Sequence, residues 1–391
     1  MSSVTEATCM HIRIEEDTLI SSQLKAFWEI KSLGITKEEP SDPEEEEALQ
    51  RFENTTQFKN ERYAVELPCR HENPELPDNY RIARRRFKGL KRRLRADVVF
   101  FQRHNEVMED YLQQGIVEEV IEGECSTSNI KYHLPHHAVL REDKPTTKLR
   151  VLFDASSHKN GFPSLNNCLL TGPNLNPDLL GILIRFRLHE IAFMADIKKA
   201  FLQISLAEID RDAVRFLCLT APPKEDTGEK LRMLRMTRVV FGVSPTPFLL
   251  AVTVRKHLHQ YGEQHTAQLI KESLYVDDMA SVCDFEEAVS VTTDARDIMA
   301  AAGMDLCKWM TNSAALKERW KETPIGPTEQ LEAHGTLLKV LGLVWRTQTD
   351  DFVFDFRPLL KKLTKNSTKR NILQHTASIV DPLGFLTPFS I

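Results

Sequence analysis

The stretch Tyr275-Val276-Asp277-Asp278 lies within an apolar, strand-like run from Leu274 to Cys283. Aspartate is a poor strand former, and two adjacent aspartates repel each other. Such a pair is expected where a hairpin tip exposes it or where a cation neutralises it. A four-residue match of this kind also arises by chance, and ordinary loop aspartates are the alternative. A functional interpretation therefore needs a partner carboxylate at a suitable place.

That partner is Asp196. It follows the apolar run from Ile191 to Ala195, whose length is typical of a buried strand. Further along the chain, Ser244-Pro245 predicts the start of a helix, with the serine as N-cap and the proline at the first helical position. The first strand and the hairpin are therefore separated by a helix.

A second helix is predicted after the hairpin. Asp284 and Glu287 have the spacing of a capping box, and Gly303 is placed to end the helix. Its apolar face carries Phe285, Ala288, Ala295, Ile298, Met299 and Ala302. A last strand is expected from Asp305 to Met310. The order strand, helix, hairpin, helix, strand is the split βαβ plan, which brings Asp196 beside the hairpin tip.

Three converging aspartates can hold two divalent cations roughly 4 Å apart, one activating an attacking 3′-hydroxyl and the other neutralising a leaving pyrophosphate. Hard oxygen ligands suit Mg²⁺, with Mn²⁺ as the alternative ion. Magnesium takes few protein carboxylates and completes its octahedron with water and substrate phosphate. An open site of this kind is what the sequence predicts.

Three segments resemble motifs A, B and C of reverse transcriptases in order and spacing: Asp196–Phe201, Ser244–Phe248 and Tyr275–Asp278. Three more resemble the fingers strand, motif D and the primer-grip motif E: Arg150–Asp154, Gly303–Trp309 and Val340–Val344. A likeness to the BEL/Pao group of long-terminal-repeat retrotransposons is carried by Leu134–Ala138, Arg150–Ser157 and Ile379–Phe385. The resemblance covers roughly residues 60 to 391.

This resemblance implies an α+β right-hand polymerase with fingers, a split βαβ palm and a partial thumb. Residues 1–60 would be an acidic extension or polyprotein connector, 61–190 the fingers, 191–335 the palm with an inserted hairpin at 214–240, and 336–391 the primer-grip hairpin and the start of the thumb. The implied activity is RNA-directed DNA synthesis from deoxynucleoside triphosphates on a primed RNA or DNA template. The chain would be a fragment of a Pol polyprotein that also encodes protease, RNase H and integrase.

The resemblance also implies a role for each matched residue. Asp196, Asp277 and Asp278 would bind the metal ions, with the Ile197 carbonyl as a further ligand. Lys308 would protonate the leaving pyrophosphate as a general acid. At the nucleotide, Arg150 would contact the triphosphate, and Phe201, beside Ala200, would be the steric gate that excludes a ribose 2′-hydroxyl. The alternatives are a solvated surface arginine and a core phenylalanine.

The sequence departs from the family pattern at two places. Val239-Val240 stands where many retroviral enzymes have Gln-Gly, which leaves one wall of the nucleotide pocket undefined. Lys199 stands where those enzymes tend to have aspartate, and Lys198 where an acidic residue is expected. Both lysines add positive charge near the metals or the triphosphate. Lys199 would help to bind phosphate, whereas the alternative for Lys198 is relaxed selection in an old copy of the element.

Charge is distributed unevenly along this chain of net charge −5. The acidic, proline-punctuated run that includes Asp42 to Glu47 is typical of a flexible connector. The run from Arg81 to Arg95 lacks acidic residues, and Arg84, Arg85, Lys91 and Arg92 are its candidate nucleic-acid contacts. The alternative is a solvated amphipathic helix. Its apolar side would carry Ile82, Phe87, Leu90, Leu94 and Val98.

Composition sets further limits. The 391 residues are 41% hydrophobic and 27% charged, which is typical of a globular protein, and no stretch approaches the roughly 18 apolar residues of a membrane span. The seven scattered cysteines favour reduced thiols in an intracellular protein. The resemblance implies the cytoplasm, within a virus-like particle, with the nucleus as the alternative. His133, His136 and His137 lack a nearby cysteine and are expected in loops or packing rather than at zinc.

Three alternatives for the function follow from the sequence. Asp226-Thr227-Gly228 matches the aspartic-protease triplet, but its polar setting between the strand-like runs Val214–Leu219 and Leu231–Val240 indicates a hairpin loop. An RNA-dependent RNA polymerase is disfavoured by the bulky Phe201. An inactive remnant or a domesticated nucleic-acid-binding protein stays open, since little chain is left for a thumb.

Overall fold

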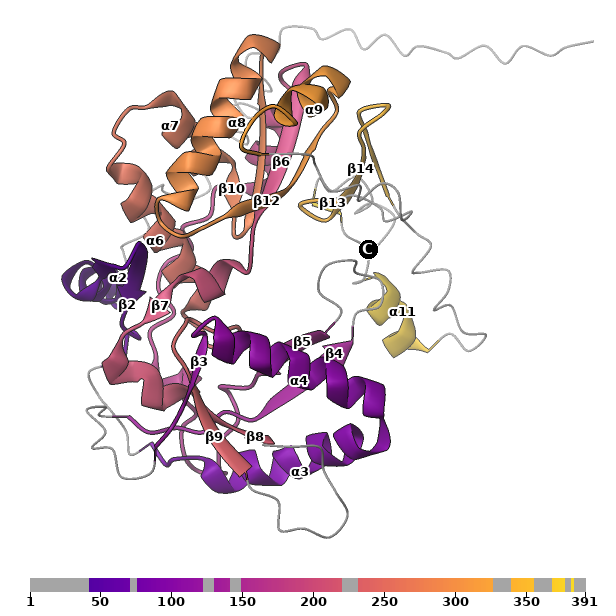
Figure 1. The fold of residues 1–391 in the computed structure, drawn as a ribbon. Helices are drawn as coiled ribbons and strands as arrows, with labels where there is room; N and C mark the ends of the chain where they lie inside the picture. The colour runs from indigo at the N-terminus through magenta and orange to yellow at the C-terminus, as the bar shows by residue number, and fades with distance from the viewer. Residues whose placement is uncertain are drawn as a thin grey trace, which may run out of the picture.

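The computed structural model describes residues 42–70, 76–121, 130–140, 149–219, 231–325, 339–354, 368–376 and 381–382. Helices and strands alternate without a single dominant class (Figure 1), which confirms the predicted α+β class. Among these residues, no helix combines the length and the apolar character needed to cross a bilayer.

A four-stranded sheet of order β10-β11-β6-β12 forms the first part of the fold. Its strands are β6 (Ile191–Ile197), β10 (Leu274–Tyr275), β11 (Asp278–Cys283) and β12 (Leu306–Thr311), and every pairing is antiparallel. β6 lies between β11 and β12 and is buried along almost its whole length. The predicted order of strand, helix, hairpin, helix and strand is confirmed.

Each face of this sheet is covered by different elements. Alternate β6 side chains Phe193 and Ala195 join the main core, which includes α6 (Thr246–His259), α7 (His265–Ser273), α8 (Phe285–Ala300) and α9 (Ala314–Trp320). The intervening Ala192 and Met194 join a second core. That core is closed by α5 (Leu179–Arg185) and by the sheet of β13 (Lys339–Val340), β14 (Leu343–Arg346) and β15 (Asp351–Val353). We call this assembly the carboxylate lobe.

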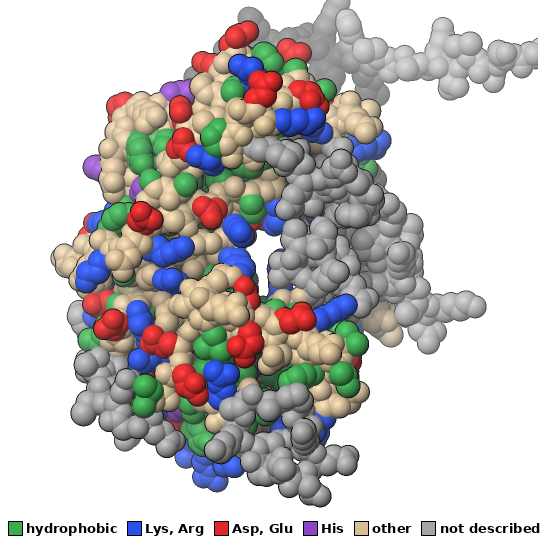
Figure 2. Space-filling model, viewed as in Figure 1, with side chains coloured by type: hydrophobic (Ala, Val, Ile, Leu, Met, Phe, Trp, Pro, Cys, Tyr) green, Lys and Arg blue, Asp and Glu red, His purple; other side chains and the backbone are tan. Residues whose placement is uncertain are grey.

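The second part, here the basic lobe, contains α3 (Tyr80–Ala96) and α4 (Val98–Gln113). They pack with the β4–β5 pair (His136–Leu140 and Leu149–Phe153) and the sheet of β3 (Val117–Glu119), β8 (Arg215–Leu219) and β9 (Leu231–Met236), of order β3-β9-β8. The predicted hairpin within 214–240 therefore forms, and it pairs with β3 rather than with the four-stranded sheet. Figure 2 shows a hollow between the two lobes with Lys and Arg side chains along part of its rim.

The expectation of a flexible connector at Asp42 to Glu47 is wrong. This run starts α2 (Pro43–Thr55), in which the Asp42 side chain accepts from the Glu44 N–H at 3.0 Å. Acidic residues in a first turn and proline at N1 both favour a helix start. Phe52 of α2 packs edge-on against Phe248 of α6, 6.4 Å between ring centroids, so this helix belongs to the main core.

Small elements follow α2 and join distant segments. β1 (Gln57–Lys59) pairs with β2 (Arg62–Val65), which runs parallel to β7 (Ser205–Leu206). Short 3-10 helices cover Asn166–Cys168 (η2), Ala200–Gln203 (η3) and Glu208–Val214 (η4). At the C-terminal side, α11 (Lys369–Thr376) is the helix described within the predicted thumb. Most of that thumb segment, like Asp226-Thr227-Gly228, lies outside the described residues.

Two of the predicted N-terminal caps do not form as expected. Ser244 is not the N-cap of α6: the helix begins after Pro245, and the Ser244 hydroxyl has no hydrogen-bond partner. At α8 the cap position of Asp284 is correct, but its carboxylate pairs with His189 instead of a helix N–H. Phe285 is 42% exposed, so it does not join the buried face.

The apolar side of α3 ends earlier than expected. Phe87, Leu90 and Leu94 are buried, but Val98 is 68% exposed because the helix stops at Ala96. Asp97 then caps α4 by accepting from the Phe100 N–H at 2.9 Å. Gly303, in contrast, follows α8 with a φ of 69°, which confirms its predicted role.

Gly242→Ala tests the contact between the turn before α6 and the end of β5. At φ 101°, an added Cβ would overlap the Phe153 carbonyl oxygen, whereas at Gly161, φ 82°, it would meet open space. Both substitutions strain the backbone by about 1–2 kcal/mol, and Gly242→Ala is expected to cost at least about 1 kcal/mol more. Urea unfolding of both variants measures this, and equal losses would contradict the contact.

Candidate active site

The three predicted carboxylates are carried by adjacent strands of the four-stranded sheet. Asp278 lies directly opposite Asp196 in the β11–β6 register, and Cys307 of β12 lies opposite Asp196 on the other side. The Ile197 N–H donates to the Asp277 carbonyl oxygen at 2.9 Å, which ties the end of β6 to the hairpin tip. The convergence predicted from the strand order is therefore present in the backbone.

The hairpin tip is strained. Tyr275 pairs with Asp278, so Val276 and Asp277 form a two-residue turn, and Val276 has a φ of 58°. A positive φ is uncommon for a β-branched residue, and such strain is found where surrounding structure holds it in place. Here the Asn176 side-chain oxygen accepts from the Val276 N–H at 3.1 Å. This contact comes from a residue that the sequence analysis did not single out.

Lys308 is directed at the carboxylates by an irregularity in β12. The register with β6 shifts between Cys307 and Met310, and Lys308 has a φ of 54°. Its ammonium donates to Asp196 Oδ2 at 2.5 Å. Although burial alone would lower it, the pKa of Lys308 is raised, because the hydrogen bond and charge of Asp196 and the charge of Asp278 hold the proton. The amine stays protonated at neutral pH.

The pKa of Asp277 is raised above its ordinary value. Burial is the largest cause and the negative charge of Asp196 the second, while Lys308 and Arg150 act in the opposite direction. The repulsion indicates that Asp277 and Asp196 lie close enough to interact. Arg150, exposed on β5 of the basic lobe, is thus brought within electrostatic range of the hairpin tip. The sequence prediction that it serves the same site gains this support.

The donor set fits a hard cation with an open coordination sphere. In the described parts of the chain, no three His, Cys, Asp or Glu side chains already surround a metal position, and Asp196 is engaged by Lys308. Magnesium needs only one or two carboxylates, since water and phosphate supply the rest. Asp196 and Asp277, two mutually repelling carboxylates, fit that need. The role of Asp278 and of the Ile197 carbonyl as ligands stays a prediction.

An aromatic pair lies after Asp196. Phe201, half-buried in η3, has its ring centroid 5.4 Å from that of Phe241, which is 60% exposed. The preceding residue, Ala200, is buried. Phe241 was missed in the sequence because one aromatic residue before a glycine forms no pattern. Val239 and Val240 are buried core residues, so the position of the family's glutamine carries no polar group here.

Lys199 does not reach the carboxylates. It adopts a left-handed conformation, φ 50°, and its ammonium contacts Asp110 Oδ2 of α4 at 3.1 Å. The same ammonium lies 5.7 Å from the centre of the Tyr111 ring. The extra charge expected near a triphosphate is therefore paired with the basic lobe, while Lys198 is exposed.

The basic helix α3 exposes most of its charge. Arg84, Arg85 and Arg92 are exposed and Lys91 is half-buried, so the apolar and basic sides predicted for this helix both exist. Arg86 forms an ion pair with Asp154 and is held against β5. Whether the exposed set contacts nucleic acid stays a prediction.

His136 and His104 take part in aromatic packing. His136 is buried on β4 among Phe87, Phe153 and Phe216, and burial lowers its pKa to about 3. His104 stacks on His136 with 6.0 Å between ring centroids, and burial lowers its pKa to about 4. Both rings are neutral at pH 7. His136 thus has the packing role that was one of the two expected from the sequence.

Comparison with known proteins concerns the fold. No family model and no curated protein matches the sequence. The structure is similar to a foamy viral protease-reverse transcriptase in complex with dsDNA, with a TM-score of 0.45 and 18% identity over 70% of this chain and 46% of that one. It is also similar to a prototype foamy virus protease-reverse transcriptase CSH mutant, with a TM-score of 0.39 and 16% identity over 75% and 30%. The chain spans less than half of either protein.

Lys308→Ala tests the charge balance. Without the ammonium, the carboxylates repel unopposed, and the metal-free protein is expected to lose about 1–3 kcal/mol of stability. Magnesium should restore part of this loss by replacing the positive charge. Thermal unfolding in EDTA and in MgCl₂ measures both, with Lys321→Ala, which breaks a surface pair with Glu318, as control. Equal losses in both buffers would show that Lys308 and a metal do not share the carboxylates.

Proposed function

We propose that this chain is a template-directed nucleotidyltransferase, an RNA-directed DNA polymerase derived from the Pol polyprotein of a retrotransposon. One observation carries the proposal: Asp196 and Asp278 are in register on neighbouring strands, with Asp277 at the adjoining turn and electrostatically coupled to Asp196. Carboxylates with this spacing and mutual repulsion favour a divalent cation. The resemblance to motifs A, B and C names the chemistry that such a site performs.

Bound Mg²⁺, or Mn²⁺, would activate a primer 3′-hydroxyl and neutralise the pyrophosphate that leaves. Asp196 and Asp277 would hold the ions, with Asp278 orienting the hairpin tip or adding a ligand. The strain at Val276 suits this task, since it fixes the two aspartates at the end of a turn rather than along a strand.

Lys308 and Arg150 would act on the triphosphate. A protonated Lys308, released from Asp196 when a cation binds there, is able to give its proton to the pyrophosphate oxygen. Arg150 approaches the same charges from the other lobe, and its planar guanidinium suits phosphate oxygens. Closing of the lobes on a nucleotide would bring both groups to it.

The Phe201–Phe241 pair would form the sugar wall of the nucleotide site. Phe201 is supported by the neighbouring ring and by the core beneath it, so a ribose 2′-hydroxyl could not displace it cheaply. This favours deoxynucleotides over ribonucleotides and a DNA product over an RNA product.

A primed RNA or DNA template would lie between the lobes, with its phosphates on four basic residues of α3: Arg84, Arg85, Lys91 and Arg92. Protease, RNase H and integrase of the same polyprotein would be partners, in the cytoplasm within a virus-like particle or in the nucleus. A nucleic-acid-binding protein without catalysis is the second candidate, because Asp196 is already neutralised by Lys308.

Asp277→Asn is expected to lower primer extension on an RNA template with deoxynucleotides and magnesium by more than about a hundredfold, since a ligand charge is lost at the reacting centre. Asp297→Asn, an exposed position on α8, is the matched control and should extend normally. Template binding measured in parallel distinguishes the two candidate functions. If the wild type bound the template but did not extend the primer, the polymerase proposal would be overturned and the nucleic-acid-binding function would be left.

Phe201→Val tests the sugar wall. The smaller side chain leaves room for a 2′-hydroxyl, so incorporation of ribonucleotides relative to deoxynucleotides is expected to rise by roughly tenfold or more. Single-nucleotide extension with each triphosphate gives the ratio. Phe241→Val removes the supporting ring and should give a smaller rise. An unchanged ratio in the Phe201 variant would assign that ring to the core alone.

A further inference from the structure

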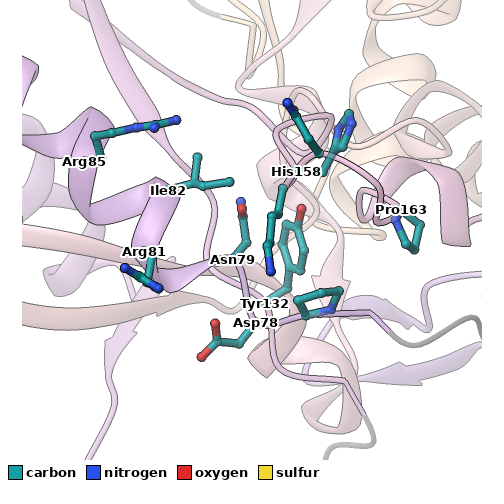
Figure 3. Close-up of a pocket in the computed structure, with 11 residues that line it drawn as sticks. Asp78, Asn79, Arg81, Ile82, Arg85, Tyr132, His158 and Pro163 are labelled. Carbon is teal, nitrogen blue, oxygen red and sulfur yellow. The ribbon is translucent and has the colours of Figure 1, made fainter.

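A second hollow lies away from the carboxylates, where α3 begins. The cavity has a volume of about 650 Å³, within the size range of ligand pockets. The start of α3, the Tyr132 segment and the loop around residues 158–163 contribute its walls (Figure 3). Its main polar lining residues are Asp78, Asn79, Arg81, Arg85, His158 and Lys159. Neither the motifs nor the proposed polymerase chemistry uses this cavity.

The charge of the cavity is positive. The lining carries one acidic side chain, that of Asp78, and three basic ones, those of Arg81, Arg85 and Lys159. The Asp78 carboxylate already accepts a hydrogen bond from the Tyr80 N–H at 3.0 Å. The first turn of the 17-residue helix α3 adds its partial positive charge. Lys159 is also positioned, since its ammonium lies 4.7 Å from the centre of the Phe162 ring. An anionic group is the complement of this wall.

Asn79 adds a second and different requirement. Its side-chain nitrogen donates to the carbonyl oxygens of His133 and Ser157 at 3.1 and 3.0 Å, which fixes the orientation of the amide. Asn79 is only 7% exposed, and its Oδ1 has no hydrogen-bond partner. The side chain points from the start of α3 into the space between Ile82 and His158 (Figure 3).

An unpaired buried acceptor calls for an N–H or O–H donor. Inorganic phosphate or a simple phosphate ester at neutral pH supplies charge but few donors. A nucleotide supplies both, since its phosphate is anionic and its base or sugar carries N–H or O–H groups. The exposed His158 ring at the rim is a surface on which a base can stack.

We propose that this cavity binds one nucleotide unit of a single-stranded nucleic acid. Arg81, Arg85 and Lys159 hold the phosphate, and Asn79 Oδ1 accepts from the base or sugar once the long lining side chains move aside. In taking a nucleic-acid strand as the ligand, the inference rests on the proposed function. The unpaired template ahead of the reaction site is the strand it would hold.

Hydrogen bonds link this cavity to the candidate active site. Asn166 donates to Ser156 Oγ at 2.9 Å and to the Gly242 carbonyl oxygen at 3.2 Å, and its own oxygen accepts from the Ser244 N–H at 2.9 Å. The loop of His158 and Lys159 is therefore fastened to the turn that carries Phe241.

The test is fluorescence anisotropy of a labelled single-stranded 12-nucleotide DNA without metal or triphosphates, using the full chain. Arg81→Ala/Lys159→Ala should weaken binding by about tenfold or more, and the slope of log K against log salt should fall by about 1.4. Lys88→Ala/Arg95→Ala removes the same charge from α3 outside the cavity lining and should change affinity less than twofold. Equal effects of the two variants would overturn the site in favour of diffuse attraction.

An abasic strand of the same length tests the nucleotide. Wild type should bind the abasic strand several-fold more weakly than DNA, and inorganic triphosphate should compete only weakly with DNA. Equal affinity for both strands would overturn the nucleotide assignment and leave an anion site. These binding measurements do not depend on catalysis. If the wild type bound the strands as expected but did not extend a primer, the result would overturn the proposed polymerase activity and leave the proposed ligand of the cavity unaffected.

Discussion

Repulsion between Asp196 and Asp277 at the end of one sheet is the constraint on which the rest of this structure depends. Antiparallel pairing of β11 with β6 places Asp278 opposite Asp196, and the turn adds Asp277 at the same end. Burial raises the pKa of Asp277, so its ionised form is costly in the folded protein. This cost is complete above the raised pKa and is lost as pH falls through it toward the ordinary aspartate pKa. The bulge that turns Lys308 toward Asp196 offsets part of this cost. A stable sheet alone requires neither the adjacent aspartates nor the bulge at Lys308.

The sheet can bear this strain because both of its faces are packed. Along β6, alternate side chains enter two separate cores, one under α6 to α9 and one under α5 and β13 to β15. In the second core, Phe186 meets Trp345 edge-on with 5.0 Å between ring centroids. A strand buried on both faces gives a continuous apolar run, which explains why β6 was recognisable in the sequence. The same packing fixes the strand end, and hence Asp196, in position.

Sequence reasoning succeeded where a long apolar pattern decides the structure and failed where single side chains choose between partners. Strand ends, the order of elements and the convergence of the aspartates follow from apolar runs. The helix caps do not follow from such runs. The Asp284 carboxylate pairs with His189, and Asp97 caps α4, so that Val98 is exposed to solvent. The acidic run at Asp42 was predicted to be a connector on composition, but acidic residues after an N-cap also favour a helix. The sequence analysis did not identify Phe241 and Asn79, because their importance lies in contacts with distant segments.

Lys199 links the two lobes next to the proposed nucleotide site. The resemblance predicts aspartate at this position, and the lysine was expected to add positive charge near the triphosphate. Yet its ammonium meets Asp110 and Tyr111 of α4, so the new charge is matched by a carboxylate and an aromatic ring from a segment about 90 residues away. The lysine instead joins α4 of the basic lobe to the start of η3, directly before Ala200 and Phe201, and so couples the position of that lobe to the wall of the proposed nucleotide site.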